Sequence, residues 1–161
     1  MYPVCVACNA LDLQRENLIN MIHVLQRDCA PPMKTVLIVD DHAEIRRLLC
    51  MTLENQDVAL HEAASGEAAL AVARAERPDL VLLDVMMPGA LDGMEVCRRI
   101  RADPGLSHTR VIMLSALDGL HDRAAGLEAG ASEFIAKPFS PARIVDTMRR
   151  IDAARAVPAG G

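Results

Sequence analysis

Between residues 33 and about 155, short apolar runs alternate with amphipathic segments, and this alternation restricts the fold more than any other feature of the chain. The runs are short enough for strands, and the amphipathic segments repeat their apolar residues at helical spacing. Strands are expected at 35–39, 57–62, 80–83, 111–114 and 132–135, and helices at 43–53, 66–76, 93–101, 120–129 and 141–154. Apolar strands that are each followed by a helix indicate a parallel sheet covered on both sides. The predicted fold class is therefore α/β, a doubly wound five-stranded parallel sheet with helices on both faces.

Two shorter segments flank this region, at residues 1–32 and 156–161. The Pro-Pro pair at 31–32 would stop a helix and form a stiff joint. The first segment carries an apolar stripe, made of Leu11, Leu18, Ile22 and Leu25. The stripe is compatible with an amphipathic docking helix, but the segment would equally be a translated upstream region, because Met33 begins a natural start for the domain. Both interpretations stay open, and residues 156–161 are expected to form a flexible tail.

The charge and the cysteines narrow the class of protein. The net charge is −5, and the densest basic group, Arg98, Arg99 and Arg101, lies close to acids. Nucleic acid is bound by clustered Lys and Arg, so direct contact with DNA is not expected. The five cysteines have no regular spacing, which favours a reducing cytoplasm over a disulfide framework. No signal peptide or apolar stretch of membrane-spanning length is visible.

Cys5 and Cys8 form a CxxC pair near the start of the chain. A zinc site needs about four ligands, and the sequence offers no second pair or nearby cluster of histidines. A redox CxxC normally lies where a strand meets the start of a helix. A metal or redox role for this pair is therefore disfavoured.

Polar residues follow four of the predicted strands. Asp40 and Asp41 come after the first strand, Asp84 after the third, Ser115 after the fourth and Lys137 after the fifth. Ligands of open parallel sheets bind outside the carboxyl ends of the strands. Three carboxylates, a hydroxyl group and an ammonium group are therefore expected to meet at one edge of the sheet.

These groups together suit the transfer of a phosphoryl group. Crowded carboxylates raise each other's pKa, and Mg²⁺, which prefers oxygen ligands, relieves their repulsion. The metal would stabilise charge on an incoming phosphoryl group, and Lys137 and Ser115 would contact its oxygens. A carboxylate nucleophile gives a mixed anhydride that water hydrolyses. A modification that is formed and then hydrolysed in this way suits a signalling switch.

Four short motifs follow one another at the ends of the predicted strands. They read Asp40-Asp41-His42, Asp84-Val85-Met86-Met87-Pro88, Leu114-Ser115-Ala116 and Phe134-Ile135-Ala136-Lys137-Pro138. In this order the chain resembles the receiver domain of two-component response regulators over residues 33 to about 155. The resemblance implies a flavodoxin-like fold and a role in phosphorelay signal transduction.

The resemblance implies a role for each matching residue at the acidic end of the site. Asp84 would be the phosphoacceptor. Asp40 and Asp41 would hold Mg²⁺, or another divalent cation, together with Asp84 and the backbone carbonyl of Met86. His42 adjoins the acidic pair and is expected to face solvent. The loop from Gly89 to Gly93 is one residue longer than in the usual family pattern and borders the site without removing a ligand.

The remaining matches concern phosphoryl binding and activation. Lys137 would pair with a phosphoryl oxygen, and Ser115 would contact the phosphoryl group and shift on activation. Phe134 would be the aromatic switch that reports the state to the surface. The plain alternatives are that Asp41 and Ser115 are helix caps and that Phe134 only fills the core.

The family's phosphodonors are histidine kinases or histidine phosphotransfer proteins. No output domain fits after the last predicted helix, so we expect a single-domain, chemotaxis-type regulator that acts on another protein. A second, phosphorylated copy of the chain stays open as a partner. The chain would not be an enzyme in the usual sense, although it would catalyse its own phosphorylation and slow dephosphorylation.

Two other functions stay open at this point. A phosphatase of the haloacid dehalogenase type also uses Asp, Mg²⁺ and Lys on a parallel sheet, but its nucleophile follows the first strand as Asp-x-Asp, where this chain has Asp40-Asp41-His42. A scaffold that binds its partner without phosphorylation is the third interpretation.

Overall fold

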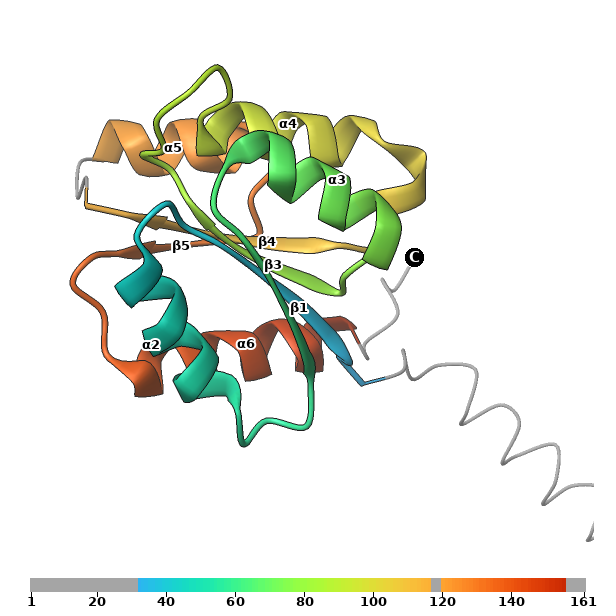
Figure 1. Ribbon diagram of the computed structural model, residues 1–161, viewed down its shortest axis with the longest axis vertical. Coiled ribbons are helices and arrows are strands. Elements are labelled where there is room, and N and C mark those ends of the chain that lie inside the picture. Colours follow the sequence, from blue (N-terminus) through green and yellow to red (C-terminus); the bar gives the residue numbers. More distant parts are fainter. Residues whose placement is uncertain (1–31, 117–119, 156–161) are drawn as a thin grey trace, which may run out of the picture. The chain divides into compact units, whose positions relative to one another are not determined.

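A computed structural model of the chain describes residues 32–116 and 120–155, and residues 33–151 form one compact unit. The elements, with the labels of Figure 1, are β1 (Thr35–Val39), α2 (Ala43–Leu53), β2 (Ala59–Ala63), α3 (Gly66–Glu76), β3 (Leu80–Asp84), α4 (Gly93–Ala102), the 3-10 turn η1 (Pro104–Leu106), β4 (Arg110–Ser115), α5 (Leu120–Glu128), β5 (Glu133–Ala136) and α6 (Pro141–Arg155). The predictions for the amphipathic stripe, the CxxC pair and the tail lie outside the described residues.

The five strands form one parallel sheet in the order β2-β1-β3-β4-β5. The predicted fold class is confirmed, and this order is the flavodoxin-like one. The chain runs outward in opposite directions from β1, to β2 on one side and to β3 on the other. A ligand site is expected at this reversal, outside the carboxyl ends of β1 and β3.

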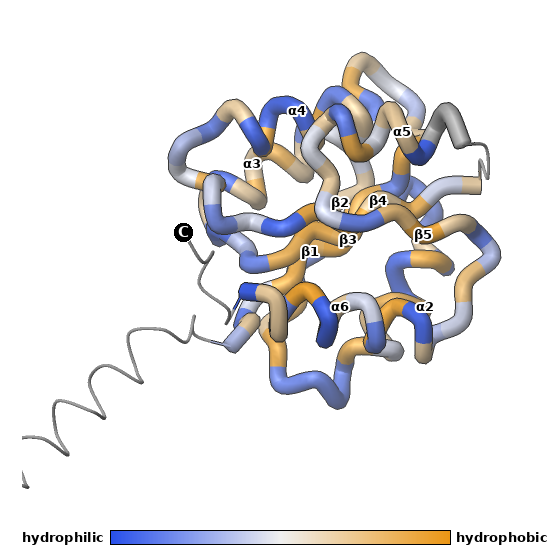
Figure 2. The backbone as a smooth tube through the Cα atoms, turned by 180° about the vertical axis from the view of Figure 1, so that it is seen from behind, coloured by the Kyte–Doolittle hydropathy of each residue, from blue (hydrophilic) through white to orange (hydrophobic). Residues whose placement is uncertain are grey.

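Helices α2 and α6 cover one face of the sheet, and α3, α4 and α5 cover the other (Figure 1). Figure 2 shows hydrophobic residues concentrated along the central strands between these two layers. Each face has its own apolar core, built largely from aliphatic side chains. β3 is buried along its whole length, as expected for a central strand of a parallel sheet with both faces covered.

Several element boundaries shift by one or two residues from the sequence prediction, and three differences are informative. Asp84 is the last residue of β3 rather than the first residue after it, because it still pairs with Leu114 of β4. The edge strand β2 begins at Ala59, since Asp57 adopts a positive φ of 52° and ends the preceding turn. The turn η1 was not predicted, and it starts where the side chain of Asp103 accepts a hydrogen bond from Gly105 N at 2.9 Å.

The loop between β3 and α4 packs closely against the strand that it follows. Gly93, the first residue of α4, donates a hydrogen bond to Val85 O at 3.0 Å. The Asp92 side chain caps α4 by accepting from Glu95 N at 2.8 Å, and Leu91 is buried in the core. The end of the longer loop is thus held against Val85, the residue that directly follows Asp84.

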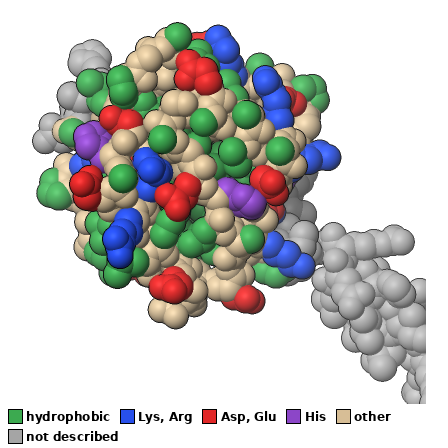
Figure 3. Space-filling view, viewed as in Figure 1, with side chains coloured by type: hydrophobic (Ala, Val, Ile, Leu, Met, Phe, Trp, Pro, Cys, Tyr) green, Lys and Arg blue, Asp and Glu red, His purple; other side chains and the backbone are tan. Residues whose placement is uncertain are grey.

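On the face shown in Figure 3, basic and acidic side chains are interspersed. No helix within the described ranges combines the length and the apolar character needed to cross a membrane.

Candidate functional site

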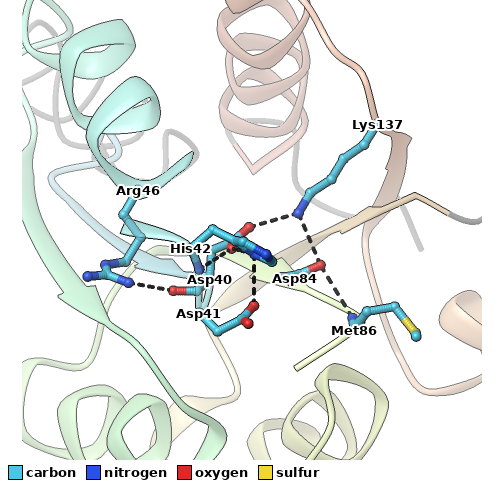
Figure 4. Close-up of polar contacts among 7 residues, drawn as sticks. All are labelled: Asp40, Asp41, His42, Arg46, Asp84, Met86 and Lys137. Atoms are coloured by element: carbon cyan, nitrogen blue, oxygen red, sulfur yellow. Dashed lines mark hydrogen bonds and ion pairs between the residues drawn. The ribbon is translucent and has the colours of Figure 1, made fainter. Parts of the chain in front are cut away.

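The predicted polar residues meet at the carboxyl edge of the sheet, at the β1–β3 reversal. Lys137, just after β5, extends its side chain toward the acids of β1 and β3 (Figure 4). Its Nζ lies 2.8 Å from Asp40 Oδ2 and 3.2 Å from Asp84 Oδ1. One ammonium group therefore bridges two carboxylates that belong to different strands.

Burial and charge set the protonation of this cluster. Asp40 is 0% and Asp84 is 2% exposed. Burial, followed by the charge of Asp40, raises the pKa of Asp84, although Lys137 acts in the opposite direction. Burial alone would lower the pKa of Lys137, but the hydrogen bond to Asp40 and the charge of Asp84 outweigh it and raise that pKa. The site therefore carries more buried negative charge than one lysine can neutralise.

Asp41 and His42 complete a cluster of possible metal ligands around Asp40 and Asp84. Asp40, Asp41, His42 and Asp84 each offer a ligand atom, and these atoms all lie within 4.8 Å of one another. The Asp41 Oδ1 atom is buried and accepts no hydrogen bond within the described part of the chain. Buried oxygens are normally hydrogen-bonded or bound to a metal, so the donor set fits a metal ion.

His42 plays a larger part than the sequence indicated. Its side chain is 62% exposed, as expected, but its Nδ1 lies 3.1 Å from Asp40 Oδ1 and 3.1 Å from Asp41 Oδ1. The hydrogen bond to Asp40 and the charge of Asp41 raise the pKa of His42. His42 also occupies the N-cap position of α2, so the interpretation of Asp41 as that cap is wrong.

Arg46 also contacts the site, and the sequence prediction missed it. Its Nη1 donates to the backbone carbonyl of Asp40 at 2.8 Å, and its Nε donates to Glu62 Oε2 at 3.1 Å. Arg46 therefore links the backbone just after β1 to the side chain of Glu62 in β2. An arginine in the helix that directly follows two acids was the available signal.

Ser115 and Phe134 lie in strands β4 and β5, and Met86 lies two residues after the end of β3. Ser115 is fully buried at the end of β4, and its carbonyl accepts from Lys137 N at 2.6 Å. The amide of Met86 donates to Asp84 Oδ1 at 3.3 Å. Phe134 is 5% exposed and belongs to the core beneath α5. The roles implied for these three residues stay predictions.

Asp84→Asn is expected to stabilise the metal-free protein at neutral pH and to have little effect in acid. A carboxyl group with a raised folded-state pKa binds more protons when folded, so stability falls as the pH rises from the unfolded pKa, about 3.9, to the folded pKa. The asparagine side chain of the variant does not titrate, so the variant does not lose stability over this pH range. Thermal unfolding with a chelator at several pH values should show the variant's advantage growing from about pH 4 upward. An advantage that is equal at every pH would contradict this explanation.

A doubly wound sheet with crowded acids and a lysine at its reversal point defines a receiver-type signalling domain. Residues 36–149 match the family model of the response regulator receiver domain, and the chain belongs to this family. Receivers are signalling switches rather than enzymes in the usual sense. The haloacid dehalogenase alternative is therefore not supported.

Relatives and solved structures agree with this assignment. The chain is 48% identical over 110 residues to the transcriptional regulatory protein ResD of Bacillus subtilis, covering 68% of this chain and 44% of ResD. It is 32% identical to the chemotaxis response regulator CheY4 of Vibrio cholerae, with a TM-score of 0.69, covering 74% of this chain and 98% of that one. A chain of the CheX–CheY–BeF3–Mg²⁺ complex of Borrelia burgdorferi is 30% identical, with a TM-score of 0.68, covering 73% of this chain and 88% of that one. The chain thus spans less than half the length of ResD.

Proposed function

We propose that the chain accepts a phosphoryl group on the Asp84 carboxylate from a histidine kinase or a histidine phosphotransfer protein. The observation that carries this proposal is the ammonium group of Lys137 held between Asp40 and Asp84. The acceptor carboxylate is thereby kept beside a cation that is positioned to meet a phosphoryl oxygen. The donor's P–N bond breaks as an O–P bond to Asp84 forms, and the donor imidazole retains a ring proton.

The supporting residues have separate tasks in this proposal. Asp40, Asp41, Asp84 and the Met86 carbonyl hold Mg²⁺, which offsets negative charge on the transferred group. Lys137 binds one phosphoryl oxygen, and Ser115 donates a hydrogen bond to another. The solved Borrelia burgdorferi complex contains both BeF3 and Mg²⁺, which supports this pairing of metal and phosphoryl group.

We further propose that the phosphorylated chain acts in the cytoplasm as a single-domain regulator that binds another protein. Phe134 would report the state of the site, because it lies on β5, whose neighbour β4 ends in Ser115. The near-complete coverage of the CheY4 chain supports this output. The coverage of only 44% of ResD supports the competing possibility of a longer regulator. The mass of the native protein distinguishes the two.

Asp84→Asn is expected to abolish labelling by a small phosphodonor. The wild-type chain, treated with acetyl phosphate and Mg²⁺, should gain one phosphoryl group by intact-mass spectrometry. The amide oxygen of the variant is a far weaker nucleophile, so the variant should gain none. Asp146→Asn is the matched control, because Asp146 is exposed in α6 and should label like the wild type. Equal labelling of the Asp84 variant would overturn the site assignment.

The scaffold alternative needs a different measurement. A phosphorylation-independent scaffold binds its partner equally well with and without beryllofluoride, whereas the proposed switch binds differently in the two states. Affinity for the partner, measured with wild-type protein and with Asp84→Asn, separates these outcomes.

A further inference from the structure

The imidazole of His42 is placed among the acids of the site in a way that the roles above do not use. Its Nδ1 lies 3.1 Å from one oxygen of Asp40 and 3.1 Å from one oxygen of Asp41. Asp40 uses its other oxygen, Oδ2, to contact Lys137. One nitrogen and two carboxylate oxygens from three consecutive residues therefore converge on one side of the acidic cluster.

The distances from His42 Nδ1 to the two carboxylate oxygens match the spacing of neighbouring corners of an octahedral metal site. Adjacent octahedral ligands lie about 3.0 Å apart when each is about 2.1 Å from the metal. The two distances from His42 Nδ1 are both 3.1 Å. Each of the two oxygens therefore lies at a distance from His42 Nδ1 that a shared metal ion allows.

One further observation points to a ligand rather than a simple contact between side chains, and a second shows how His42 is held in position. Asp41 Oδ1 is buried and accepts no hydrogen bond among the described residues, although it faces His42 Nδ1. The backbone of His42 is anchored, because its amide donates to Asp40 Oδ1 at 2.9 Å. The ring is therefore held near the acids while 62% of the side chain stays exposed, which leaves room for water on the metal.

We propose that His42 Nδ1 is a ligand of the metal site, so that the site favours a divalent transition metal such as Mn²⁺ over Mg²⁺. Imidazole nitrogen suits transition metals, whereas Mg²⁺ prefers oxygen. The metal takes the place of the proton on Nδ1, and the neutral ring carries its one proton on Nε2. The inference rests on the metal site of the proposed function but not on phosphoryl transfer.

The test compares the full-length wild type with His42→Asn and uses Mn²⁺ and Mg²⁺ as probes. Asn suits a helix N-cap, so the variant should fold. We expect His42→Asn to weaken Mn²⁺ binding by about tenfold, the low end of what losing an outer partner of a metal ligand costs, and Mg²⁺ binding much less. His108→Asn is the control, because His108 contacts the Arg77 carbonyl, away from the acids.

A spectroscopic measurement identifies the ligand directly. Electron spin-echo modulation of bound Mn²⁺ should show coupling to a histidine nitrogen in the wild type and in His108→Asn, and none in His42→Asn. Binding of Mn²⁺ without nitrogen coupling, or an equal loss of Mn²⁺ and Mg²⁺ affinity, would overturn the role of His42 alone. Absence of any metal binding by the wild type would overturn the proposed metal site as well, and phosphodonor labelling would then be judged separately.

Discussion

Lys137→Met should destabilise the metal-free protein by about 3 kcal/mol, since removing one partner of a buried ion pair leaves an uncompensated charge. Here two carboxylates lose the same cation, because Lys137 Nζ contacts both Asp40 and Asp84. The methionine keeps much of the length of the side chain, so the loss reports charge rather than volume. Urea denaturation with a chelator at neutral pH measures it.

Two comparisons separate the charge effect from a general packing defect. Adding Mg²⁺ should restore part of the lost stability, because a divalent cation replaces the missing positive charge. Combining Lys137→Met with Asp84→Asn should also recover part of it, since one of the unpaired charges is gone. Lys34→Met, which changes an exposed lysine, should have little effect. A loss that neither Mg²⁺ nor Asp84→Asn reduces would contradict the electrostatic explanation.

Gly93→Ala should reduce both stability and metal affinity, because the start of α4 lies directly on the backbone of Asp84 and Val85. A Cβ at this position would overlap the Asp84 carbonyl oxygen and lie 2.7 Å from Val85 Cα. Backbone atoms cannot move away by changing rotamer, so we expect a cost of about 1–3 kcal/mol. The shift would also displace the Asp84 carboxylate. Thermal unfolding and Mn²⁺ titration measure the two effects.

The intrinsic preference of the helix acts in the opposite direction in this experiment. Replacing Gly by Ala stabilises a helix by about 0.5–1 kcal/mol in its interior, and the preference has the same sign at Gly93, the first residue of α4. A net loss therefore has to come from the contact with β3. Gly105→Ala is the control, because its Cβ would meet only the carboxylate end of Asp103, at 3.2 Å. Similar losses in both variants would show that the close approach at Gly93 is unimportant.

The sheet and the strand-end acids were predictable from sequence because both follow from local patterns. A central parallel strand is apolar on both faces, and β3 reads as a continuous apolar run that stops at an acid. β2 was harder to place, because an edge strand is half exposed and its pattern is weak. The turn η1 was missed because its main local signal is one capping aspartate. The Pro-Gly pair that follows the aspartate is typical of a loop.

The contacts of His42 and Arg46 were harder to predict, because the positions of the two residues beside the acids do not specify which atoms they contact. Each depends on the direction of one side chain, and no periodicity specifies it. His42 turns one nitrogen toward the acids while most of its surface faces solvent. Arg46 reaches back to the carbonyl of Asp40, which lies six residues earlier in the chain. Such contacts follow from the three-dimensional arrangement of β1, β2 and α2.

The side chains of β3 alternate between the two cores of the protein. Val81 and Leu83 pack in the core beneath α3, α4 and α5, and Leu82 packs in the core beneath α2 and α6. Asp84 is the last residue of this strand. Because close-packed interiors transmit strain, a small movement of the strand's tip is felt by both helical layers. Under the proposed function, a change at Asp84 would therefore reach the surfaces on both sides of the sheet.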